Sequence, residues 1–158
     1  MSVIDIELAM KHLLAEPEDK DLVQSQLDGA EMAAVAYLNR AFFVDQAALD
    51  SARASVPAAR NQARVAYDTS MVLAAAIEDR FQSCEAMADA QFVFSEALTA
   101  ATRNARGMVI NKAIEAACLL KLGHLFANRE EVVTGTIATE LPQSSKALLA
   151  PYRIGMGV

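Results

Sequence analysis

The chain has 158 residues, the length of one ordinary domain, and 54% of them are hydrophobic, with only 4 prolines, 6 glycines and no tryptophan. Many of the hydrophobic residues are alanine, which loses no side-chain entropy on ordering, so the predicted fold class is an all-α helical bundle. The formal charge of −6 gathers in residues 1–44, which hold 8 acids and 3 bases; this argues against a nucleic-acid grip, which needs clustered lysine and arginine.

The first 44 residues predict two helices separated by an acidic break. Apolar residues at helical spacing behind an N-cap at Asp5 predict a short helix near 5–15, which ends before Pro17. The acids in 18–21 then lie where the dipole of a helix over roughly 19–40 favours negative charge. A calcium loop is the alternative for these acids, but the ligand spacing and the glycine of an EF-hand are missing. The stripe of the second helix comprises Leu22, Val23, Leu27, Ala30/Glu31, Ala34 and Leu38.

Residues 45–106 differ in texture and predict a helical hairpin inserted into a smaller domain. They are rich in Ala, Arg, Asp and Gln and hold a single proline, Pro57. Two antiparallel helices, near 58–83 and 86–104, are expected to bury their apolar stripes against each other. The arginines are interleaved with acids, which favours a solvated face over phosphate contacts. The stripes are Val65, Val72/Leu73, Ala76/Ile77 and Phe81 on one helix, and Met87, Phe94, Leu98 and Ala101 on the other.

Gly107 separates this hairpin from the most apolar helix of the chain, about 108–128 within a central-helix segment 107–133. A helix that is apolar nearly all round is a buried one, so it is expected to be the spine of the fold. It contains Lys112, Glu115 and Lys121, which makes a membrane span unfavourable. The N-terminus also lacks the basic region of a secretory signal.

The C-terminal part, 134–158, is predicted as an extended loop, a short helix and a tail. The β-branched run Val132–Thr139 favours an extended strand, which would pair with a neighbouring subunit. A short helix is then expected from Pro142 to Leu149. The tail after it is apolar and aromatic and is expected to have no partner within its own domain.

No catalytic, cofactor-binding or metal-binding residues are predicted. The residues three before His12 and His124 are Ala9 and Lys121, so the Glu-x-x-His motif of di-iron bundles is absent, and His124 is expected to be a buried, hydrogen-bonded structural histidine. The side chains of the adjacent Glu130 and Glu131 would diverge on a helix, which does not suit acid–base work; either could pair with Arg129. Two isolated cysteines, expected to be buried or idle, suggest a reducing cytoplasm: Cys84 and Cys118.

Several stretches resemble the head–tail connector (adaptor, head-completion) proteins of tailed bacteriophages. The most specific is AACLLKLGHLFANRE over 116–130, followed by Glu140-Leu141-Pro142 and by ALLAPYR over 147–153. The helix running into AYLNR at 36–40 also fits, and the hairpin resembles that of longer family members, so the match covers nearly the whole chain. The departures are Phe126, where a tyrosine is common, and Gln143-Ser144-Ser145, which replaces an apolar, glycine-containing stretch.

The resemblance implies a non-enzymatic homo-oligomeric ring, usually of twelve copies, that docks under the portal protein after genome packaging. The ring would extend the channel through which double-stranded DNA passes without sequence-specific binding. It would also give the tail or stopper protein its attachment surface. The acidic charge of residues 1–44 suits a surface that DNA passes without sticking, and solubility alone explains this charge equally well. The implied location is the virion, at the head–tail interface, after assembly in the host bacterial cytoplasm, with no membrane.

Carried over to this sequence, the resemblance assigns portal contacts to the C-terminal segment Pro151, Tyr152, Arg153 and Ile154. It makes Arg129 and Glu130 the turn that organises the subunit, and with the strand residues Val133, Thr136 and Ile137 they form the expected subunit interface. A ring needs two different faces per subunit, for which the hairpin and the strand are candidates. The alternatives are a helical protein-binding adaptor or regulator unrelated to virions, and a helical-bundle enzyme.

Overall fold

The computed structural model describes residues 2–128 and 143–155, and in these ranges it confirms the all-α fold: six α-helices, two short 3-10 helices and two strands of two residues each. The chain divides into two compact units. The first comprises Met1–Gln46 with Met108–Val158, and the second Ala47–Gly107. This division agrees to within two residues with the predicted insertion at 45–106.

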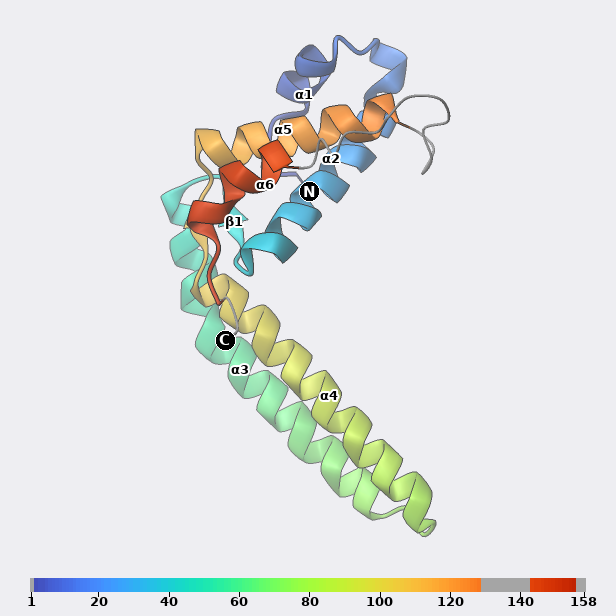
Figure 1. The fold of residues 1–158 in the computed structure, drawn as a ribbon. Coiled ribbons are helices and arrows are strands. Elements are labelled where there is room, and N and C mark those ends of the chain that lie inside the picture. Colours follow the sequence, from blue (N-terminus) through green and yellow to red (C-terminus); the bar gives the residue numbers. More distant parts are fainter. Residues whose placement is uncertain (1, 129–142, 156–158) are drawn as a thin grey trace. The chain divides into compact units, whose positions relative to one another are not determined.

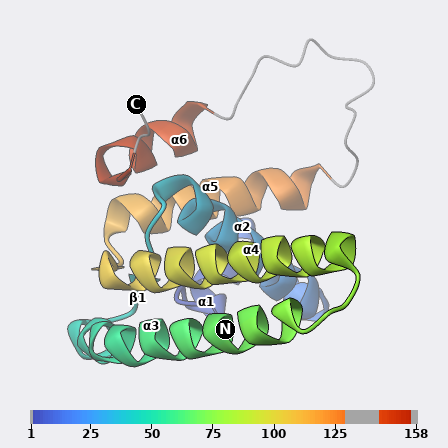
Figure 2. The ribbon, with the colours of Figure 1, turned by 90° about the horizontal axis from the view of Figure 1, so that it is seen from below.

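The first unit is built around the antiparallel packing of two helices, α2 and α5, with α1 and α6 on different sides of α5 (Figures 1 and 2). Its largest fully buried side chains come from α2 and α5: Val23, Leu27, Leu38, Ile114, Cys118 and Leu122. In chain order its elements are α1 (Ile6–Leu13), η1 (Pro17–Asp19), α2 (Lys20–Leu38), β1 (Phe42–Phe43), β2 (Met108–Val109), α5 (Lys112–Ala127), α6 (Gln143–Leu149) and η2 (Ala150–Tyr152). The two N-terminal helices and the short C-terminal helix lie close to their predicted places.

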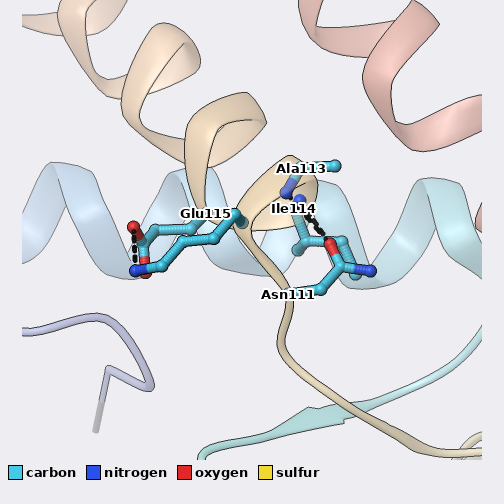
Figure 3. A network of polar contacts seen from close by, with 5 residues as sticks. Asn111, Ala113, Ile114 and Glu115 are labelled. Carbon is cyan, nitrogen blue, oxygen red and sulfur yellow. Dashed lines mark hydrogen bonds and ion pairs between the residues drawn. The ribbon is translucent and has the colours of Figure 1, made fainter.

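The central helix begins later than predicted. Asn111 is its N-cap: the Asn111 side chain accepts hydrogen bonds from the backbone of Ala113 at 3.1 Å and Ile114 at 3.0 Å (Figure 3). The predicted start at 108 is therefore wrong, because Met108 and Val109 form a parallel pairing with Phe42–Phe43 instead. An asparagine that satisfies two of the free donors at a helix start favours that start over continued helix before it. The spine prediction holds in part: α5 supplies five buried residues to the core, but Leu120 of the same helix is 44% exposed.

A buried carboxylate fixes the N-terminal segment on α2. Glu31 is 7% exposed although it lies on the apolar stripe of the helix. Its oxygens accept hydrogen bonds from the Ser2 hydroxyl at 2.5 Å, from the Ile4 backbone at 2.9 Å and from the Val3 backbone at 3.0 Å. These bonds offset the desolvation of the carboxylate and position the segment that leads into α1.

The second unit is a hairpin of two antiparallel helices, α3 (Gln46–Ala75) and α4 (Arg80–Ala105). The predicted start of α3 near 58 is wrong: the helix runs through Pro57. A proline inside a helix removes one hydrogen bond, but the residues before it are mostly good helix formers. Two apolar side chains of α3 that precede the proline are also buried, Leu49 and Val56.

The seam of the hairpin contains the stripe predicted for its second helix, with Ala101 buried and Met87, Phe94 and Leu98 half-buried, but not the stripe predicted for its first helix. The rings of Tyr67 and Phe94 stack with centroids 4.9 Å apart, and Ala74 and Ala101 are buried. Small side chains let the helix backbones approach closely, which turns the bulkier residues beside them outward. The stripe predicted for the first helix of the hairpin is wrong at every position, because all of its residues are exposed: Val65, Val72, Leu73, Ala76, Ile77 and Phe81, the last of which lies in α4.

Candidate assembly surfaces

The C-terminal segment lies against the end of α2. Tyr152 packs on the core of the first unit, and the Arg153 guanidinium carbon lies 4.9 Å from the centroid of the Tyr37 ring. The backbone N–H of Ile154 donates to the Leu38 carbonyl at 3.1 Å. The expectation that this tail has no internal partner is therefore wrong as far as Ile154. The carbonyls at the end of a helix need donors, and the tail supplies one.

These contacts leave part of the predicted portal-binding set accessible. Pro151 and Arg153 are exposed, and Tyr152 and Ile154 are half-buried. The structure thus brings all four predicted residues together in one short segment with a fixed backbone. The predicted subunit-interface residues lie outside the described part of the chain, so that assignment stays a prediction: Arg129, Glu130, Val133, Thr136 and Ile137.

A pocket of about 450 Å³ opens between α2, α5 and α6. Its floor is apolar and made of small residues, and its rim carries the cationic side chains Lys121 and Lys146 together with His124. Sequence reasoning missed this pocket, although alanines at spacings of three and four on α2 were a visible signal. The lining residues are Ala30, Ala33, Ala34, Tyr37, Ala117, Leu120, Lys121, His124, Ser144, Ser145, Lys146 and Leu149.

His124 is exposed on this rim, so the expectation of a buried structural histidine is wrong. It is hydrogen-bonded, however, because the Asn128 side-chain amide lies 3.2 Å from its Nδ1 atom and donates to its backbone carbonyl at 3.0 Å. The histidine lies in the last turn of α5, on the side of the helix that lines the pocket. The prediction of burial rested on the apolar composition of the whole helix, which does not show that one side chain near its end is exposed.

The hairpin has an apolar face of its own. A groove of about 460 Å³ runs between α3 and α4, with Leu73, Ile77 and Val93 exposed along it. Exposed apolar residues that gather on one face are typical of a protein-binding surface.

The two thiols differ in environment. Cys118 is buried, and burial together with the nearby Glu31 charge raises its pKa to about 12. Cys84 is exposed, so of the two thiols that were expected to be buried or idle only Cys118 is buried. Within the described residues, no group of three or more His, Cys, Asp or Glu side chains is placed to hold a metal ion, and no helix is long and apolar enough to cross a membrane.

Comparison of the chain with protein-family models, with curated proteins and with solved structures found no match.

Proposed function

We propose that this chain is the ring subunit of a bacteriophage head–tail connector. It docks on the portal protein, extends the DNA channel, and provides the attachment surface for tail or stopper proteins. It acts through its surfaces and performs no bond-making chemistry.

One observation carries this proposal: two separate segments of the family resemblance meet in the fold. The AYLNR segment at 36–40 ends α2, and the ALLAPYR segment at 147–153 forms α6 and η2. They join through Arg153 on Tyr37 and through the bond from Ile154 to Leu38. Because the residues of the two segments both belong to the resemblance and also contact each other, they support a single feature: a C-terminal segment that is anchored on the end of α2.

The chemistry of that segment suits a protein interface. Tyrosine and arginine are enriched at binding hot spots, because each combines a large contact area with polar atoms. A backbone held by Leu38 loses less entropy on binding than a free tail does. The net charge of residues 1–44 supports a subunit that does not retain DNA.

The test is a pull-down of the full chain with the portal protein of the same phage genome. The double variant Y152A/R153A is expected to lose portal binding while its circular dichroism stays helical. Ser25→Ala is the control. Ser25 is exposed on α2, the helix that the C-terminal segment contacts, and lies about 20 Å from the contact at Leu38 at 1.5 Å per residue. Equal portal binding by Y152A/R153A and S25A would refute the tail assignment.

Negative-stain imaging with and without portal tests the wider proposal. We expect rings on the portal vertex that are absent from portal alone. If the wild-type chain does not bind the portal, it is not a connector.

The exposed apolar face of the hairpin favours a second candidate, a helical protein-binding adaptor unrelated to virions. Such a protein would stay indifferent to portal and would lose its partner when Leu73 and Val93 are replaced by serine. A connector whose rim uses the C-terminal segment would keep portal binding after those replacements.

A further inference from the structure

Leu14 is exposed in a way that the isolated subunit does not explain. Its side chain is 89% exposed, the most of the exposed large hydrophobic residues within the described part of the chain. It ends α1 in the left-handed region, with φ 53° and ψ 36°. Glycine normally occupies this helix-ending position, because a side chain there is strained. A strained residue that presents a leucine to solvent points to a role outside its own subunit.

The pocket between α2, α5 and α6 has the complementary properties. Its floor is apolar, with Ala30 and Ala117 at 1% exposure and Leu149 at 6%. Its volume of about 450 Å³ is large enough for more than one aliphatic side chain. Pro17, also exposed, lies three residues after Leu14 and would enter with it.

The charges around the two features are also complementary. Glu16 and Glu18, both exposed, follow Leu14 closely in sequence. Lys121 and Lys146 stand on the rim of the pocket. None of these four side chains forms an ion pair with another described residue. We call Leu14 the knob. Opposite charges around the knob and around the apolar pocket set the register of a contact between them and speed its formation.

The knob and the pocket cannot meet within one subunit, because α1 and α6 lie on different sides of α5 (Figures 1 and 2). Gly123 of α5 faces α1, because a Cβ atom at this position would lie 3.9 Å from His12 Nε2 and 4.0 Å from Leu13 Cδ2. The contact must therefore join two molecules.

We propose that Leu14 of one copy inserts into the α2–α5–α6 pocket of a second copy, with Glu16 and Glu18 against Lys121 and Lys146. The two surfaces differ, so each copy keeps one free knob and one free pocket, and repetition gives a ring or a filament. This inference deepens the proposed function by naming the subunit interface, but its test needs no portal.

The test uses two variants of the full chain that each disable one half of the contact. Leu14→Gly removes the knob and keeps the fold, since glycine adopts the left-handed conformation freely. Ala33→Trp fills the pocket from an exposed lining position and adds the only tryptophan of the chain, whose fluorescence reports folding. Met32→Ala is the matched control: Met32 is 73% exposed on the same helix but does not line the pocket.

Sedimentation velocity should show concentration-dependent oligomers for wild type and Met32→Ala, and monomers for each disabled variant. Loss of one buried leucine side chain weakens each contact about 30-fold. An equimolar mixture of the two disabled variants should form a dimer and nothing larger, because only one intact knob and one intact pocket remain per pair.

A second set of variants, in which charges are reversed, tests whether the acidic residues after Leu14 lie against the lysines of the pocket. E16K/E18K and K121E/K146E should each weaken association, and the two changes combined in one chain should restore it.

Three results would overturn the inference. The first is a wild-type chain that stays monomeric up to about 1 mM, the limit of a weak specific contact. The second is unchanged oligomers in both disabled variants, which would assign self-association to other surfaces and leave the connector proposal intact. The third is a mixture that stays monomeric while Ala33→Trp alone loses portal binding, which would make the pocket a portal site.

Discussion

Replacing Glu31 tests whether a single buried carboxylate fixes the N-terminal segment to the first unit. Its oxygens accept from the Ser2 hydroxyl and from the backbone N–H groups of Val3 and Ile4. Glu31→Ala removes the acceptor of the half-buried Val3 N–H and leaves the buried Ile4 N–H only the Ser2 hydroxyl at 3.2 Å. An unsatisfied buried donor costs about 1–3 kcal/mol, so the expected destabilisation is about 2–4 kcal/mol. Glu31→Gln keeps one oxygen acceptor but loses the charge, and about 1.5–3 kcal/mol is expected.

Because the chain folds as two units, a single unfolding free energy would mix their contributions. Native-state hydrogen exchange read by mass spectrometry separates them, since each peptide reports its own opening free energy. Peptides from α1 and α2 are expected to lose protection in Glu31→Ala, whereas peptides from residues 47–107 should not change. Glu115→Gln is the control, because it breaks an ion pair with Lys112, whose side chain is 89% exposed, and such a pair is worth about 1 kcal/mol at most.

The reasoning is refuted if Glu31→Ala and Glu115→Gln lose the same protection. It is also refuted if the hairpin peptides respond as strongly as α2 does. Either result would mean that the hydrogen bonds to the first four residues carry little of the packing of α1.

Four further predictions concern single residues. In the native chain, iodoacetamide should modify Cys84 and spare Cys118, and peptide mass mapping that finds equal labelling would contradict the burial. Burial in the folded state raises the pKa of Cys118 from 9.0 to about 12. The unfolded chain therefore loses this proton first, so the free energy of unfolding is unaffected below pH 9 and falls between pH 9 and 12 by about 1.4 kcal/mol per pH unit. Urea titrations of wild type and Cys118→Ala should differ in this slope. Asn111→Ala should cost about 1 kcal/mol by removing the cap of α5, and Asn111→Asp should recover most of it in thermal melts. Leu14→Gly should raise the stability of the monomer by about 1 kcal/mol, and a fall in melting temperature would show that the left-handed leucine carries no strain.

Apolar periodicity predicted the places of α1 and α2, because each has an apolar stripe in its own sequence, and a cap marks the start of α1. Asp5, the predicted N-cap, accepts from the Glu7 backbone at 3.0 Å. Periodicity failed where a contact distant in sequence decides the outcome. Met108 and Val109 join a strand because Phe42 and Phe43 are beside them, and nothing local announces this pairing.

The candidate site was predictable only as a segment. The resemblance selected residues 151–154, and the structure shows them together at the end of α2. The pocket could not be predicted, since it depends on how far apart three helices stand over alanines such as Ala30 and Ala117. Glu31 on an apolar stripe was the clearest anomaly in the sequence, but its partners, the Ser2 hydroxyl and two backbone N–H groups, are distant in sequence and were not predicted.

The hairpin differs from the first unit in how much it buries. Within residues 47–107, the buried hydrophobic side chains are Leu49, Val56, Ala74 and Ala101, two of them alanine. A two-helix hairpin with so small a core is marginal on its own, because packing supplies most helix stability in water. Its amides are therefore expected to exchange faster than those of α2 and α5 in the monomer. Assembly should slow this exchange if the apolar face with Leu73 and Val93 is covered by a neighbour. Hairpin amides as protected as those of α5 in the monomer would instead mean that the alanine seam suffices, and that this face is free for another partner.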